Sequence, residues 1–157
     1  MARTVKLSPA QFRDTLGISQ ETLRHWRKSL PVFHGRNGYA PAFTASDLVV
    51  GVVIKLLREQ WGISVASFAE QSVSLGQAVH KQPWSLLANS VLQLSLVDKS
   101  CVLVPCAENR PIESPSLLVP LAPIVEQLTA ALLHEADREQ VPIYFPPVEV
   151  ARKSGTS

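Results

Sequence analysis

The side chains with the clearest chemical potential lie in one short stretch, residues 17–30, which reads GISQETLRHWRKSL. Its first part offers groups that hydrogen-bond to base edges: arginine pairs with guanine, glutamine with adenine, a carboxylate with cytosine N4, and threonine with a base or a thymine methyl. Its second part offers cations for phosphates. The candidate base contacts are Gln20, Glu21, Thr22 and Arg24, and the candidate phosphate contacts are His25, Arg27 and Lys28. The chemistry that this pattern favours is recognition of double-stranded DNA.

Two short helices are expected to position these groups. A serine–proline pair at Ser8 opens the first helix, since serine is a good N-cap and proline fits the first turn. Gly17 is a natural stop, and Ser19 caps a second helix that runs to about residue 28. Leu23 and Trp26 mark its buried side. Two short helices joined by a glycine-containing turn are typical of a helix-turn-helix.

The next segment predicts a small wing. An Asn37-Gly38 pair is the strongest short signal for a β-hairpin, and apolar residues flank it on both sides. We therefore expect a two-stranded wing over residues 30–43. Arg36, Asn37 and Tyr39 would then be placed to grip the DNA backbone beside the second helix.

The remaining elements follow from capping and periodicity. Thr44 and Asp47 come close to a capping box and open a helix over about residues 45–61, and a fourth helix starts at Ser64. Alternating apolar residues predict a β-hairpin whose second strand is Cys101–Cys106, residues 108–116 read as a linker, and Leu121–Glu139 is an amphipathic helix.

These elements predict a fold that is mostly α with small β. The expected division is a winged helix-turn-helix domain over residues 5–80, a C-terminal hairpin and helix over 83–146, and a flexible tail over 147–157. The last helix could pair two subunits through its apolar stripe, or it could pack on its own hairpin. A homodimer through the C-terminal region is the expectation for a DNA-binding protein.

Charge is distributed unevenly along the chain. Residues 1–60 carry nine Lys/Arg against four Asp/Glu, a net of +5, whereas residues 61–157 carry six against nine, a net of −3. Such an asymmetry indicates that one half meets a polyanion. No apolar run reaches the roughly 18 residues that a membrane span needs, and the N-terminus lacks a signal-like segment. We expect a cytoplasmic protein with no membrane partner.

Residues for catalysis or metal binding are sparse. The four histidines are scattered, and no zinc-protease, nucleophile-elbow or phosphate-loop motif occurs. Four residues separate Cys101 from Cys106, which is not the usual zinc spacing, and in a strand the two side chains face opposite sides. We expect two reduced thiols, no metal, no cofactor and no enzymatic activity; a thiol or metal sensor is the alternative for the cysteines.

The N-terminal half resembles the MerR family of transcription regulators, whose second helix reads roughly G-V-S-x-x-T-L-R-Y-Y. This chain has GISQETLRHW over residues 17–26, Asn37-Gly38-Tyr39 in the expected wing, TASDL over 44–48, and WGIS over 61–64, similar to the family's joint before its second helix pair. The resemblance covers about residues 5–75. It implies a winged helix-turn-helix that binds DNA as a dimer.

By position, the resemblance places the candidates of the second helix against bases and adjoining phosphates. His25 stands where the family has a phosphate-contacting tyrosine, and Glu21 stands where a basic residue is common. The family's wing pattern G-Y-R-x-Y becomes GYAPAF over residues 38–43, which loses the arginine. Residues 76–157 do not resemble the coiled coil and metal loop of metal-sensing members.

Three interpretations remain open from sequence. The first is a sequence-specific, dimeric transcription regulator that acts on a palindromic site, in a bacterium or a phage. The second is an architectural DNA-binding protein, similar to an excisionase or to a phage or plasmid maintenance factor. The third is a protein-interaction module that uses the winged helix only as a scaffold and binds its partner through the hairpin.

Overall fold

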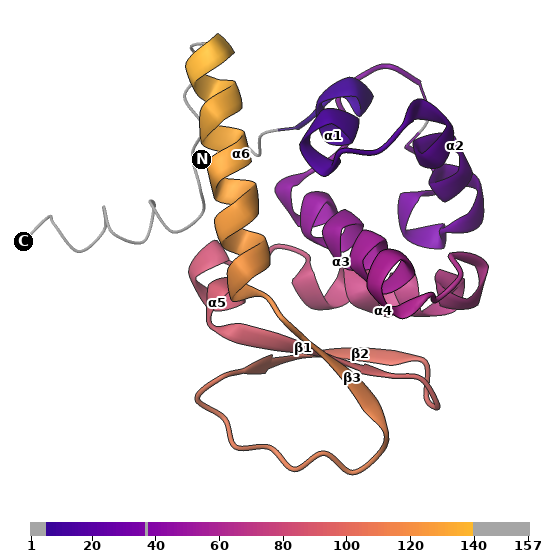
Figure 1. Ribbon diagram of the computed structural model, residues 1–157, viewed down its shortest axis with the longest axis vertical. Coiled ribbons are helices and arrows are strands. Elements are labelled where there is room, and N and C mark those ends of the chain that lie inside the picture. Colours follow the sequence, from indigo (N-terminus) through magenta and orange to yellow (C-terminus); the bar gives the residue numbers. More distant parts are fainter. Residues whose placement is uncertain (1–5, 37, 140–157) are drawn as a thin grey trace, which may run out of the picture.

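Helices form most of the described part of the chain, and a small antiparallel sheet lies along one side of them (Figure 1). The computed structural model describes residues 6–36 and 38–139, the last five of these as helical backbone only. The helices are α1 (Pro9–Leu16), α2 (Gln20–Ser29), α3 (Ala45–Trp61), α4 (Ala69–Val79), α5 (Trp84–Ala88) and α6 (Ala122–Glu139), with 3-10 turns η1 (Pro31–Phe33) and η2 (Ala66–Phe68). The strands are β1 (Ser90–Ser95), β2 (Ser100–Pro105) and β3 (Ser116–Pro120).

The caps predicted for α1 and α2 are confirmed. The Ser8 side chain accepts a hydrogen bond from the backbone of Gln11, whose side chain accepts one in return. Gly17 ends α1 in the left-handed conformation, at φ 66°. Ser19 caps α2 by accepting from the backbone N–H of Thr22 at 3.1 Å. A turn of only three residues therefore sets the direction of α2 relative to α1.

The prediction of a two-stranded hairpin over residues 30–43 is wrong. Pro31 opens the 3-10 turn η1, which carries Phe33 into the core, and the described residues of this segment form no strands with one another. Phe43 pairs instead with Leu7, whose N–H donates to the Phe43 carbonyl at 2.7 Å. Both phenylalanines are fully buried, so core packing overrides the local hairpin signal. Asn37 lies outside the described residues.

Helix α3 connects the N-terminal helices to the rest of the molecule. Its capping box is confirmed, since Asp47 Oδ2 accepts from Thr44 N at 2.7 Å and Thr44 Oγ1 accepts from Asp47 N at 3.3 Å. Lys55 donates to the Leu16 carbonyl at the end of α1, at 2.9 Å. A cation here also complements the negative end of the α1 dipole. The α1–α2 turn is thereby fixed to the side of α3.

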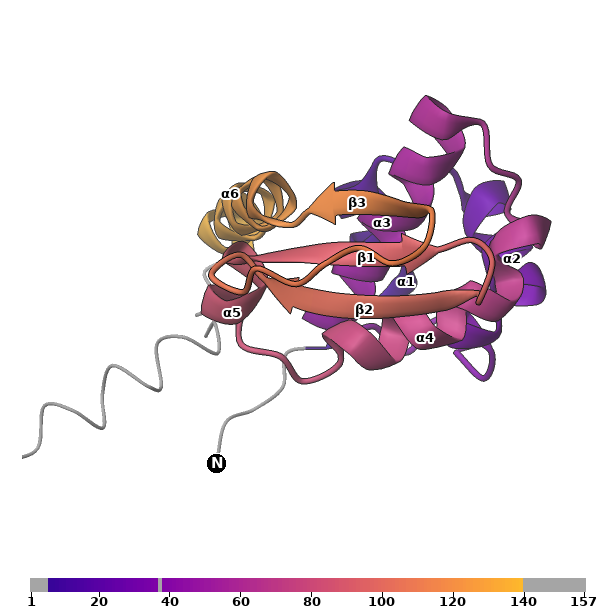
Figure 2. The same cartoon turned by 90° about the horizontal axis from the view of Figure 1, so that it is seen from below.

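The sheet has the order β2-β1-β3 with both pairs antiparallel, and Figure 2 shows the helices behind it. The predicted hairpin corresponds to β1 and β2 and is confirmed. β3 was not predicted, because SLLVP lacks alternation and ends in proline, and only pairing with β1 identifies it as a strand. The buried Gln71 of α4 donates to the carbonyls of Ser95 and Ser100, at 2.9 and 3.0 Å. Helix α4 thus fixes the turn of the hairpin.

One hydrophobic cluster includes residues from every helix and from the sheet. The apolar stripe of α6 is buried within its own chain, against α5, α3 and α1. The buried stripe residues are Leu121, directly before α6, and Ile124, Val125, Leu128 and Leu132 within it. This helix therefore already has intramolecular partners for its apolar face. The predicted boundary between residues 80 and 83 stays a prediction, and the tail over 147–157 lies outside the described residues.

Candidate nucleic-acid interface

Most of the polar residues predicted on α2 share one exposed face. Residues three and four apart on a helix lie on the same side, and Leu23 and Trp26, at 2% and 1% exposure, take the opposite side into the core. The exposed candidates on α2 are Gln20, Glu21, Arg24, His25 and Lys28. Figure 1 shows α1 and α2 on the side of α3 away from the sheet. The candidates thus lie together on a helix face that no other described element covers.

Two of the predicted residues on α2 have local hydrogen-bond partners. Thr22 is half-buried, and its hydroxyl lies 2.9 Å from that of the N-cap Ser19. Nδ1 of His25 lies 3.4 Å from the hydroxyl of Ser29, one turn further along the helix. Thr22 therefore contributes to the cap of α2, whereas His25 stays on the exposed face.

Arg27 and Arg36 both lie close to the buried ring of Phe43. The Arg27 guanidinium lies 5.5 Å from the ring centroid and donates to the Gly38 carbonyl at 3.3 Å. The Arg36 guanidinium lies 5.9 Å from the same centroid and pairs with the carboxylate of Asp47. Burial lowers the pKa of both arginines. Both side chains hold the segment before α3 in place, a role that the sequence did not reveal.

Tyr39 projects from that segment into solvent. It is 89% exposed, the largest value among the exposed large hydrophobic residues of the described chain. It follows Gly38, whose φ of 89° favours glycine. Arg27 holds the carbonyl of Gly38, so the position of Tyr39 depends on a contact from α2.

A hollow with a volume of about 420 Å³ lies between α1, α2 and residues 38–39. Arg13, Arg24 and Arg27 line it, together with Gln20 and Tyr39. Within the described part of the chain, none of the three arginines forms an ion pair with a carboxylate. We call this concavity, with its three arginines, the arginine cleft. Three guanidinium groups without a carboxylate partner around one hollow favour an anion such as a phosphate.

Arg13 is the residue of the arginine cleft that was not predicted. Helix α1 carries its buried side on Phe12 and Leu16, and Arg13 lies next to Phe12 in sequence and half-buried at the rim of the cleft. A cation directly beside the buried stripe of the first helix was the available signal. Its proximity to Arg24 depends on the angle between α1 and α2, which a sequence pattern does not give.

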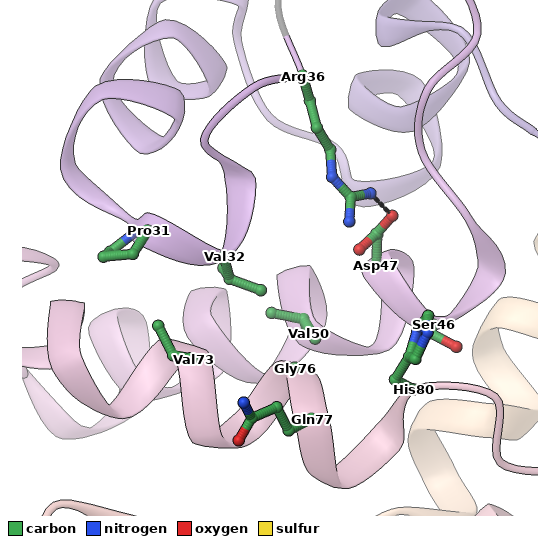
Figure 3. A pocket seen from close by; sticks show the side chains of 10 residues that line it. All are labelled: Pro31, Val32, Arg36, Ser46, Asp47, Val50, Val73, Gly76, Gln77 and His80. Carbon is green, nitrogen blue, oxygen red and sulfur yellow. Dashed lines mark hydrogen bonds and ion pairs between the residues drawn. The ribbon is translucent and has the colours of Figure 1, made fainter.

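A second hollow of about 320 Å³ lies between η1, the start of α3, and α4 (Figure 3). Val32, Val50 and Val73 form its apolar walls, and the ion pair of Arg36 with Asp47 lies above them. Oδ2 of Asp47 also accepts two hydrogen bonds from Thr44. These groups satisfy one another and anchor the segment before α3.

The cysteines differ sharply in environment. Cys101 is buried, and burial raises the pKa of its thiol to about 12, whereas Cys106 is exposed. A thiol with so high a pKa is a poor nucleophile near neutral pH, because the thiolate is the reactive form. Within residues 6–36 and 38–139, no cluster of three or more His, Cys, Asp or Glu side chains could hold a metal ion. No described helix is both long and apolar enough to traverse a lipid bilayer.

Comparison of the chain with models of protein families, with curated proteins and with solved structures finds no match in any of the three.

Proposed function

We propose that this protein binds double-stranded DNA in a sequence-specific manner, with α2 in the major groove. The observation that carries the proposal is the exposed face of α2, which gathers Gln20, Glu21 and Arg24 in its first turns and Lys28 near its end. Base-reading groups near the N-terminus of a helix and a cation beyond them are the arrangement of a recognition helix. The short α1–α2 turn matches the helix-turn-helix pattern.

The arginine cleft supports the same proposal. It lies beside the exposed face of α2 and includes Arg13 of α1. Its positive charge therefore extends beyond the recognition helix. In this proposal Arg13 and Arg27 of the cleft bind a backbone phosphate next to the groove, with Tyr39 beside it, while Arg24 faces the bases. Because residues 30–43 form no hairpin, the wing contact would come from a loop and not from a strand.

The resemblance to MerR regulators favours a transcription regulator over an architectural DNA-binding protein. The proposed homodimer would need a surface other than the apolar stripe of α6, because that stripe is buried within its own chain. Recovery of bound genomic fragments separates the two functions: sites between promoter elements support regulation, and sites at recombination or partition loci support an architectural role.

The test of DNA binding is a salt titration with a fluorescent duplex. We expect log K to fall linearly with log salt, and Lys28→Ala to reduce that slope by about 1, because one phosphate contact is lost. Arg110→Ala is the control and should keep the wild-type slope, since Arg110 is an exposed cation in the loop between β2 and β3, where it pairs with Glu108 at 3.6 Å. Fluorescence anisotropy gives both slopes. If the protein binds no duplex at low salt, or if Lys28→Ala and the wild type have equal slopes, α2 is not the helix that contacts DNA.

A further inference from the structure

Glu21 is an acid on the otherwise cationic or neutral exposed face of α2. It is the second residue of the helix and is exposed. Arg24 and His25 follow it by three and four residues and share its side of the helix. Nevertheless, Glu21 forms no ion pair with any residue that the structure describes. Its carboxylate is therefore free to meet a ligand.

A carboxylate at this position opposes binding to phosphate but fits the edge of one base. In the major groove, cytosine presents the N4 amino group as a donor, thymine presents the O4 acceptor, and guanine presents the acceptors O6 and N7. Adenine offers a donor at N6, but its N7 acceptor lies beside it. A carboxylate is acceptor-only, so cytosine is the base that it matches without repulsion.

The position of Arg24 predicts a contact with a second base. Three residues of helix rise by about 4.5 Å, which is close to the roughly 3.4 Å between successive base pairs. Glu21 and Arg24 would therefore face neighbouring base pairs when α2 lies along the groove. Arginine makes its best base contact with O6 and N7 of guanine.

We propose that Glu21 determines specificity by accepting a hydrogen bond from cytosine N4, while Arg24 binds guanine in the adjacent base pair. This inference rests on the proposed function and deepens it, because it names the sequence class of the DNA site. Glu21 lowers the affinity for DNA in general, because its carboxylate repels phosphates. Its hydrogen bond restores affinity only where a cytosine faces it. Glu21 would thus make binding by α2 depend on the base sequence as well as on charge.

The experiment is selection of bound duplexes from a random pool by the wild type, Glu21→Gln and Glu59→Gln. Glu59 is an exposed acid in the last turns of α3, so its variant makes the same charge change away from α2. We expect wild-type sites to contain cytosine next to guanine at one fixed position. Glu21→Gln should weaken the preference for that cytosine by about tenfold and shift it toward adenine, the partner of glutamine, while the adjacent guanine stays. Glu59→Gln should recover the wild-type site.

The outcomes separate the inference from the proposed function. Recovery of the same cytosine with the same preference by Glu21→Gln overturns the role of Glu21 and leaves DNA binding intact. A wild type that retains no duplex at low salt overturns the proposed function and the inference with it. Glu21→Ala is the second variant: it should lose the preference for cytosine without gaining one for adenine. Circular dichroism and thermal melting confirm that each variant is folded.

Discussion

Replacing Phe12 with alanine is expected to lower the free energy of unfolding by about 3–5 kcal/mol. Phe12 is fully buried, stacks on Phe43 at 4.1 Å between ring centroids, and meets Phe33 edge-on at 5.8 Å. Phe33 in turn stacks on Trp26 of α2 at 6.2 Å. The substitution removes a large apolar side chain from the middle of this cluster and leaves a cavity. Equilibrium denaturation in urea, monitored by circular dichroism, measures the loss.

Tyr39→Ala is the matched control for this substitution. It also removes an aromatic ring, but Tyr39 is 89% exposed, so its loss should change stability by no more than about 0.5 kcal/mol. The contrast tests whether Phe12, Phe33, Phe43 and Trp26 form the core that supports α2. Equal losses for Phe12→Ala and Tyr39→Ala would show that they do not.

Replacing Arg24 with alanine is expected to weaken binding to the specific DNA site by about 1–3 kcal/mol, which is roughly 5- to 150-fold in the dissociation constant. Arg24 is exposed on α2, lines the arginine cleft and has no acidic partner among the described side chains. Its guanidinium is therefore available for a base. Anisotropy titrations with the selected site and with an unrelated duplex measure the loss of affinity and the loss of specificity separately.

Arg58→Ala is the control for Arg24→Ala. Arg58 is an exposed arginine in the last turn of α3, so its removal changes the net charge equally. We expect its affinity for the selected site to remain near that of the wild type. If Arg24→Ala keeps both the affinity and the sequence preference of the wild type, Arg24 does not belong among the base-reading residues.

Local signals in the sequence were sufficient for most helices. Ser8, Ser19 and Thr44 are caps that act through residues three positions away, and Gly17 and Gly62 end their helices in the left-handed conformation. Such contacts depend only on neighbours in the chain, so a sequence pattern reveals them. The predicted start of the fourth helix at Ser64 was less accurate, because the 3-10 turn η2 precedes α4.

Features that depend on contacts between distant residues were not predictable in the same way. The Asn37-Gly38 pair signalled a hairpin, yet Phe33 and Phe43 each pack into the aromatic core instead of lying on paired strands. Strand β3 exists because β1 offers it a partner. The contacts of Arg27 with Gly38 and of Arg36 with Asp47 also join segments eleven residues apart. The exposed face of α2 was accessible to sequence reasoning because helical periodicity alone separates it from Leu23 and Trp26.

The most direct test of the central claim is to follow the backbone amide signals of the protein by NMR as a DNA duplex carrying the selected site is added. We expect the largest shifts in α2 from Gln20 to Ser29, around Arg13, and at Gly38 and Tyr39, with little change in β1, β2 and β3. Shifts concentrated on the sheet, or no shifts at low salt, would contradict the placement of α2 in the major groove.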